Sequence, residues 1–217
     1  MDKNDYRIVI PVKGNSQRAP EKNSLLLGWT LEYVRRLGLQ EKAAVLSQHE
    51  GYLLEARNQG MTAIKEKRDY PDQIPAICQV IGDLEWEEKL IVMLQPTQPL
   101  RQHWLLQRCL EKLRDQPEHI VTTCSHRTLK KFIFNDEGSG SYSTQFSNQP
   151  SLTAAIFCAH ASAFLAHDNH RAMWEHTLVQ FIKHKYPANL DFDYPEDMIS
   201  APTITPSIFD LFYYSQS

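Results

Sequence analysis

Near its N-terminus the chain contains Arg7-Ile8-Val9-Ile10-Pro11, which leads directly into Val12-Lys13-Gly14-Asn15-Ser16-Gln17-Arg18-Ala19-Pro20-Glu21-Lys22-Asn23. The first part is an apolar, β-rich run, which predicts a buried strand. The loop after it combines Gly14 and the hydroxyl of Ser16 with the cations Lys13, Arg18 and Lys22. This composition suits a polyphosphate, although ordinary solvated surface remains an alternative. Because open parallel sheets bind ligands at the carboxyl ends of their strands, the loop is the first candidate for a binding site.

Short β-rich runs and amphipathic helical stretches alternate along the rest of the chain. We expect strands at 7–11, 43–47, 61–64, 89–94, 119–124, 155–160 and 190–193, and helices at 50–59, 73–84, 102–114 and 172–185. Gly60 can close the helix at 50–59 in the left-handed conformation. The alternation predicts an α/β fold with a doubly wound, mostly parallel sheet and helices on both faces.

The alternation breaks between about 125 and 150, where two strand-like runs flank a strong turn signal at 135–140 and predict a β-hairpin. Such a protrusion is a lid, a dimer arm or a plain surface hairpin, and the sequence leaves these alternatives open. We expect residues 1–201 to form one domain that carries this hairpin, and residues 202–217 to form a C-terminal tail. The aromatic residues of the tail would pack on the body or on a partner subunit.

Composition narrows the class of protein. The chain has 217 residues, of which 42% are hydrophobic and 23% charged, as expected for a single globular domain. A net charge of −3 without a run of Lys or Arg argues against binding to nucleic acid. No apolar run approaches the roughly 20 residues of a membrane helix, and no secretory signal precedes the first strand, so we expect a cytoplasmic protein. The four cysteines lie far apart, which favours reduced and mostly buried thiols.

A pair of carboxylates near the C-terminus is the candidate metal site. Asp191 and Asp193 lie in the short strand expected at 190–193, and residues two apart in a strand project to the same side. They can therefore converge on a hard cation such as Mg²⁺. The alternative is that they are ordinary acids at the end of a strand. For Glu196 and Asp197 we prefer a similar structural explanation, because acids are favoured at the start of a helix.

Three motifs in this order resemble the acylneuraminate cytidylyltransferase family, the CMP-sialic acid synthetases. They are the loop from Pro11 to Asn23, the turn Leu94-Gln95-Pro96-Thr97-Gln98-Pro99-Leu100-Arg101, and the Asp-x-Asp-x-Pro-Glu-Asp pattern at 191–197. The second and third match the family closely and are specific in combination, and the resemblance extends from about residue 6 to residue 201. It implies a Rossmann-like fold of the nucleotide-diphospho-sugar transferase type.

The resemblance also implies an activity. In the family, the anomeric hydroxyl of a nonulosonic acid attacks the α-phosphorus of CTP, which gives a CMP-sugar and pyrophosphate. The implied substrates are CTP and a sugar acid, the implied cofactor is Mg²⁺, and the implied assembly is a homodimer. Such chemistry needs charge neutralisation and positioning more than covalent catalysis.

The family's functional positions map onto this chain one by one. Lys13 stands where the family has its phosphate-binding Arg, and with Lys22 it is the implied catalytic cation. The positions that match the nucleotide-contacting ones are Lys13, Gly14, Ser16, Lys22 and Asn23. Gln95 matches the residue that contacts the sugar acid, and Asp191 and Asp193 match the metal-binding pair.

The chain departs from the family pattern at several positions. Asn15 replaces the second glycine of the loop, Gln17 replaces a lysine, and Lys13 keeps the charge of the family's Arg without its planar fork. Where the family has Asn-Gly near the sugar, this chain has Thr153-Ala154. Three alternatives therefore stay open: a nonulosonic acid as substrate, a different sugar such as an octulosonic acid, or a catalytically silent homologue that binds a nucleotide or a sugar.

Overall fold

The computed structural model describes residues 5–13, 22–125, 128–134, 140–146, 151–184 and 204–215, with the backbone alone described at 22, 125, 128–134, 140–146 and 151–153. The predicted strand at 190–193, with Asp191 and Asp193, lies outside these residues. So do Gly14 and Ser16 of the basic loop and the turn at 135–139.

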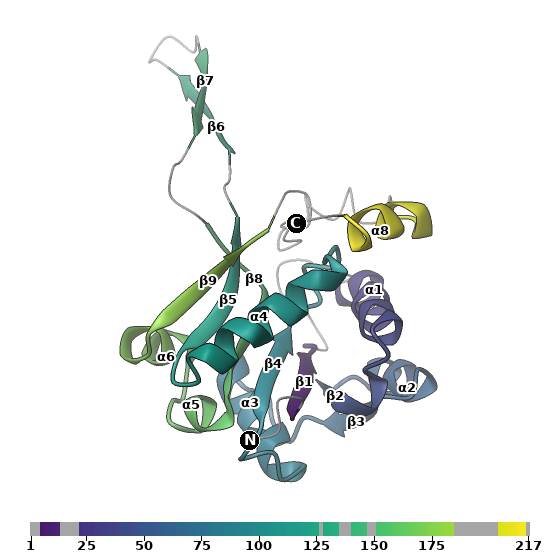
Figure 1. Ribbon diagram of the computed structural model, residues 1–217. Helices are drawn as coiled ribbons and strands as arrows, with labels where there is room; N and C mark the ends of the chain where they lie inside the picture. The colour runs from purple at the N-terminus through teal and green to yellow at the C-terminus, as the bar shows by residue number, and fades with distance from the viewer. Residues whose placement is uncertain are drawn as a thin grey trace.

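A seven-stranded sheet forms the centre of the molecule, in the order β3-β2-β1-β4-β8-β5-β9 (Figure 1). Its strands are β1 (Tyr6–Pro11), β2 (Ala43–Ser47), β3 (Thr62–Lys65), β4 (Leu90–Leu94), β5 (Ile120–Ser125), β8 (Ser151–His160) and β9 (Val179–Lys183). Strand β8 runs antiparallel to its neighbours β4 and β5, whereas the other neighbouring pairs are parallel. The predicted mostly parallel sheet is confirmed.

Helices cover both faces of this sheet. They are α1 (Lys22–Arg36), α2 (Glu50–Asn58), α3 (Gln73–Asp83), α4 (His103–Asp115), α5 (Ala161–Leu165), α6 (His170–His176) and α8 (Pro206–Tyr213), with a short 3-10 turn, η1 (Gln40–Lys42). Alternate residues of β1 point to opposite faces: Ile8 and Ile10 pack with α1 and α4, while Val9 packs with α3. This two-sided burial explains why the parallel strands are continuous apolar runs in the sequence.

The predicted helix at 172–185 is wrong in its second half. Helix α6 ends at His176, and Thr177 after it has an extended backbone, with φ −128° and ψ 140°. The residues that follow form β9, which pairs in parallel with β5 at the edge of the sheet. The run Val179-Gln180-Phe181-Ile182 is rich in the β-branched and aromatic residues that favour strands, so an available sheet edge overrides the helical periodicity.

The predicted hairpin is present as β6 (Thr128–Phe134) paired antiparallel with β7 (Gly140–Phe146), and Figure 1 shows it projecting beyond the sheet. The described part of the tail, 204–215, packs on the body. The rings of Phe209 in α8 and Trp29 in α1 stack with centroids 5.1 Å apart, and Asp210 forms an ion pair with Arg36. The indole of Trp104 donates a hydrogen bond of 2.9 Å to the carbonyl of Ser215.

Three of the four thiols are buried and the thiol of Cys78 is half-buried. Gly60 has φ 77° at the end of α2, as expected for a left-handed helix cap. Within the residues that the structure describes, no helix is both long enough and apolar enough to cross a membrane.

Candidate functional site

The parallel strands bring the candidate residues to one edge of the sheet. Lys13 follows β1, Glu66 follows β3 and Gln95 follows β4, and each of these strands ends at the same edge because all run in the same direction. His184, which follows β9, lies at the carboxyl end of its strand as well. The sequence predicted this edge as the binding edge for Lys13, and the family resemblance implied a role for Gln95, but neither gave a role to Glu66 or His184.

Lys13 and Asn23, the described ends of the basic loop, are hydrogen-bonded to each other. The buried side-chain amide of Asn23 donates a bond of 2.6 Å to the carbonyl of Lys13. The N–H of Val12 donates to the carbonyl of Leu46, which ties the same segment to β2. The first turn of α1 therefore lies against the end of β1, at the edge of the sheet where the parallel strands end. The side chain of Lys22, at the start of α1, is outside the described residues.

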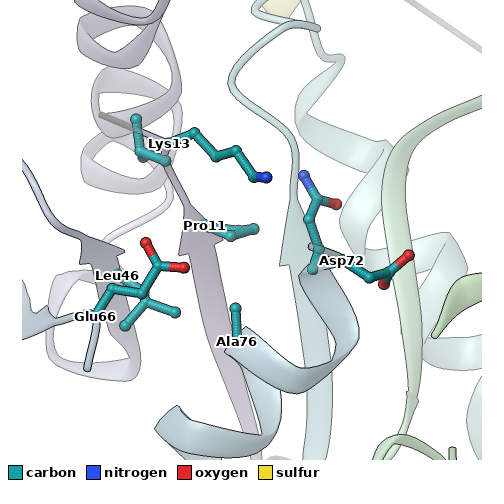
Figure 2. Close-up of a pocket in the computed structure, with 8 residues that line it drawn as sticks. Pro11, Lys13, Leu46, Glu66, Asp72 and Ala76 are labelled. Carbon is teal, nitrogen blue, oxygen red and sulfur yellow. The ribbon is translucent and has the colours of Figure 1, made fainter. Parts of the chain in front are cut away.

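A small hollow lies beneath the Lys13 side chain, with a volume of about 20 Å³. Figure 2 shows the Lys13 ammonium group extending over it, with Glu66 on one side and Asp72 on the other. The ammonium donates a hydrogen bond of 3.1 Å to the carbonyl of Tyr70. This volume holds about one water molecule, so a larger ligand would lie above Lys13 and not within the hollow.

The carboxyl group of Glu66 is nearly buried beside this cation. Burial raises its pKa above the ordinary range, an effect that the backbone N–H of Tyr70 and the Lys13 ammonium oppose. Asp72 on the opposite side caps α3 by accepting from the N–H of Ile74, and it also pairs with His170 at 2.8 Å. Glu66 follows the strand expected at 61–64, so its position after a strand was the signal in the sequence that could have found it.

Arg101 holds the turn that carries Gln95. Its side chain is fully buried, and its Nε donates to the carbonyl of Ala155 at 2.9 Å. One terminal nitrogen donates to Thr30 Oγ1 in α1 at 3.1 Å, and the other donates to the carbonyl of Gln95. The guanidinium thus joins α1, the loop after β4 and strand β8. Although Arg101 belongs to a recognised motif, its burial follows from elements far apart in the sequence.

His184 lies close enough to Arg101 to be influenced by its charge. Burial lowers the pKa of His184 to about 4, and the positive charge of Arg101 acts in the same direction. The backbone N–H of His184 donates to the carbonyl of Cys124 at 3.1 Å, which fixes the end of β9 against β5. The imidazole is therefore neutral in the folded protein at ordinary pH.

We expect this histidine to make the protein sensitive to acid. The unfolded chain takes up a proton near the ordinary pKa of 6.5, whereas the folded chain does so only near 4. Acidification from about pH 7 to pH 5 should therefore lower the free energy of unfolding by on the order of 1 to 2 kcal/mol. Urea unfolding at several pH values measures this. The His184→Asn variant should not show this decrease in the free energy of unfolding between pH 7 and pH 5. The His176→Asn variant, changed at an exposed histidine, should show it as the wild type does.

The strand next to Gln95 contains a backbone irregularity. Ala154 has φ 50°, in the left-handed region, and the pairing of β5 with β8 shifts register between Thr122 and Cys124. Left-handed backbone costs roughly 1–2 kcal/mol in a residue with a side chain. Ala154 stands where the family resemblance has glycine, and its positive φ is a conformation that glycine adopts more readily than alanine.

One curated protein and several solved structures are similar to this chain. The chain is 27% identical over 124 residues to a 3-deoxy-manno-octulosonate cytidylyltransferase from Bdellovibrio bacteriovorus, a match that covers 54% of this chain and 49% of the relative. The chain thus spans about half the length of that curated relative. No protein-family model matches the chain.

Two solved structures are similar over most of the chain. The first is CMP:2-keto-3-deoxy-manno-octonic acid synthetase complexed with CTP, with a TM-score of 0.64 and 14% identity, covering 93% of this chain and 100% of the other. The second is 4-diphosphocytidyl-2C-methyl-D-erythritol synthase from Anaerococcus prevotii, with a TM-score of 0.62 and 12% identity, covering 91% and 97%. The chain has a nucleotidyltransferase fold. The predicted fold class is confirmed.

In this nucleotidyltransferase fold, the strain at Ala154 can be tested directly. Ala154→Gly should raise the free energy of unfolding by about 0.5–1 kcal/mol, because glycine adopts positive φ without a steric cost and loses only part of that gain through chain entropy. Ala155→Gly at the next position should instead lower the free energy of unfolding, because it removes a fully buried methyl group and adds chain entropy without relieving a positive φ. Chemical denaturation measures both, and a destabilised Ala154→Gly protein would contradict the interpretation.

Proposed function

We propose that the protein is a CTP-dependent cytidylyltransferase that transfers CMP to a 3-deoxy-octulosonic acid. The observation that carries the proposal is the placement of Lys13, Asn23 and Gln95 at one sheet edge, in a fold shared with a synthetase solved in complex with CTP. The octulosonate cytidylyltransferase relative supports the octulosonic acid over the sialic-acid-like substrate that the sequence motifs first suggested. The replacement of the family's Asn-Gly by Thr153-Ala154 agrees with this choice.

The reaction needs little covalent chemistry from the protein. A hydroxyl oxygen of the sugar acid forms a bond to the α-phosphorus of CTP, the bond from that phosphorus to the α–β bridging oxygen breaks, and pyrophosphate leaves. The hydroxyl proton is released. Negative charge gathers on the phosphate oxygens during this exchange, so fixed cations close to them stabilise the transition state.

Each candidate residue has a role in this proposal. Lys13 and Lys22 would neutralise the phosphates, while Gly14, Ser16 and Asn23 would shape the nucleotide side and Gln95 would bind the sugar acid. Asp191 and Asp193 would hold Mg²⁺, because paired carboxylates are the oxygen donors that this ion prefers. A bound Mg²⁺ supplies further charge neutralisation at the phosphates.

A catalytically silent homologue is the second candidate. Lys13 in place of the family's Arg and Asn15 in place of its glycine both favour it, since a lysine binds phosphate without the bidentate grip of arginine. In this alternative the same edge would bind a nucleotide or a sugar without transferring CMP.

Pyrophosphate release separates these functions. The protein would be assayed with each nucleoside triphosphate against 3-deoxy-manno-octulosonate and N-acetylneuraminate in the presence of Mg²⁺. We expect release with CTP and the octulosonic acid. Release with the neuraminate alone would return the substrate to a nonulosonic acid, and CTP binding without release under any condition would favour the silent homologue.

We also propose that the protein is a homodimer, with the β6–β7 hairpin as a dimer arm. A two-stranded hairpin is only marginally stable by itself, so a second copy is a suitable cover for it. Light scattering should give twice the chain mass of 25.1 kDa. Replacing residues 128–146 with a short Gly-Ser linker should give the mass of a single chain, and a monomeric wild type would exclude the arm.

A further inference from the structure

The buried Arg101 joins the two segments that would surround the sugar acid in the proposed site, a region that we call the acceptor side. Gln95 follows β4, and Ala154 and Ala155 lie in β8, which pairs with β4 so that Leu94 is opposite Ile156. The guanidinium donates to the carbonyls of both Gln95 and Ala155. The family resemblance implies a sugar contact for Gln95, and residues 153–154 stand where the family has the Asn-Gly near the sugar. The two hydrogen bonds of Arg101 therefore reach both segments that would surround the sugar acid.

We propose that Arg101 is a positioning residue for the sugar acid: it sets the separation between Gln95 and Ala154, the residue of β8 with left-handed backbone. This inference rests on the proposed function, because it concerns the acceptor of that reaction. Arg101 acts through its neighbours and is not a catalytic residue.

The shape of the guanidinium is what the role requires. It is planar and carries five N–H donors in fixed directions, so it can serve acceptors from three elements at once. A lysine ammonium at the end of a flexible stem cannot reach Thr30, Gln95 and Ala155 together. Because the guanidinium is fully buried, its hydrogen bonds are not exchanged with water, and each lost bond leaves a buried polar group unsatisfied.

The strain at Ala154 supports a functional role for this clamp, which we define as Arg101 with its bonds to Gln95 and Ala155. Residues in sparsely populated backbone conformations persist only where the surrounding structure holds them, and they concentrate at functional sites. The bond from Arg101 to the carbonyl of Ala155 is one peptide unit from the strained residue. The clamp therefore holds Ala154 in a left-handed conformation that an unconstrained alanine would leave.

The nucleotide side is held by other contacts. Asn23 bonds to the carbonyl of Lys13, and Val12 bonds to Leu46, without the participation of Arg101. The hydrogen bond from Arg101 to Thr30 anchors the guanidinium to the middle of α1 and involves neither Gln95 nor Ala155. Loss of the clamp should thus affect the sugar acid and spare CTP.

The test compares Arg101→Lys with Thr30→Val, which removes one hydrogen bond of the same buried network but leaves the clamp intact. Arg101→Lys should lower kcat/KM for the octulosonic acid by about ten- to a hundredfold, as expected for a misplaced substrate, while the KM for CTP stays within about threefold. Thr30→Val should lower the melting temperature but leave both constants within about threefold.

A rescue experiment separates positioning from general stability. Adding Ala154→Gly to Arg101→Lys should recover part of the lost kcat/KM, because glycine adopts the left-handed conformation without the steric cost that alanine has. If Arg101→Lys alone does not fold, the double variant is compared with Ala154→Gly, and the acceptor constant should still fall through the lost bond to Gln95.

The outcomes distinguish this inference from the proposed function. The clamp is overturned if the constants for CTP and the sugar acid fall together, if Thr30→Val matches Arg101→Lys, or if neither constant changes. A wild-type protein that releases no pyrophosphate with any sugar acid overturns the proposed function and the clamp with it. An active wild type with an unaffected Arg101→Lys variant overturns the clamp alone.

Discussion

Asp193→Asn is expected to leave the fold intact and to lower turnover by about a hundredfold or more, even in saturating Mg²⁺. The change keeps the size of the side chain but removes the negative charge that would hold the ion against the triphosphate. Metal neutralisation of a transferring phosphate is worth several kcal/mol, and each 1.36 kcal/mol corresponds to about tenfold in rate. Pyrophosphate release as a function of Mg²⁺ concentration measures the effect.

Asp197→Asn is the matched control for this prediction. Asp197 is in the same acidic motif, but the sequence predicts an ordinary position for it in the first turn of a helix, so the turnover of the Asp197→Asn variant should stay within about threefold of wild type. Circular dichroism of both variants checks that each is folded. A fully active Asp193→Asn protein would remove the metal role from this pair, whereas equal loss in both variants would indicate a general effect of charge.

Lys13→Ala is expected to weaken CTP binding by about 1.5–3 kcal/mol, the contribution of a charge-assisted contact, which is more than tenfold in affinity. The Lys13 ammonium already lies over the ligand edge, where it donates to the carbonyl of Tyr70. A triphosphate offers it a charged acceptor in place of that neutral one. Calorimetric titration with CTP measures the difference, and Lys22→Ala should behave in the same way.

Variants that restore the family residues sharpen this prediction. Lys13→Arg should tighten CTP binding by supplying the planar fork, and adding Asn15→Gly should tighten it further by letting the backbone approach the phosphates. Lys89→Ala is the control, because Lys89 pairs with Asp5 next to the amino end of β4, at the opposite edge of the sheet. If no folded variant binds CTP, the nucleotide site has been lost and the silent homologue is the better description.

The elements that the sequence predicted well are those whose buried residues form a regular pattern along the chain. Parallel strands such as β4 are buried along their whole length, so they are uninterrupted apolar runs. The apolar stripe of α4 was likewise predictable from its spacing, and Leu106, Cys109, Leu110 and Leu113 are all buried. Helix α1 was missed although Leu26, Leu27 and Leu31 on it are fully buried, and α8 was missed because its packing partners lie on α1 and α4.

The candidate site was predictable only as far as strand order allowed. The rule that ligands bind at the carboxyl ends of parallel strands was enough to place Lys13 at a binding edge, whereas Gln95 was a candidate only through the family resemblance. It does not predict which side chains reach that edge from other elements. The burial of Arg101 depends on Thr30 and Ala155, 71 and 54 residues away along the chain, and no local pattern encodes those distances.

Because β8 runs antiparallel to β4 and β5, the molecule has one part that tolerates insertions and deletions and another part that does not. Strand β5 ends and β8 begins at the ligand edge, where Ser125 pairs with Ser151, so the chain leaves the sheet for the hairpin and returns to it at that edge. In the proposed function, the strands β3, β2, β1 and β4, which pair in parallel with one another, would carry the nucleotide side. Insertions or deletions in the hairpin would therefore change the part of the proposed site that faces the nucleotide and would leave the parallel strands unchanged. Under the proposed function, a change of acceptor would therefore require changes in the hairpin segment and not in the strands on the nucleotide side.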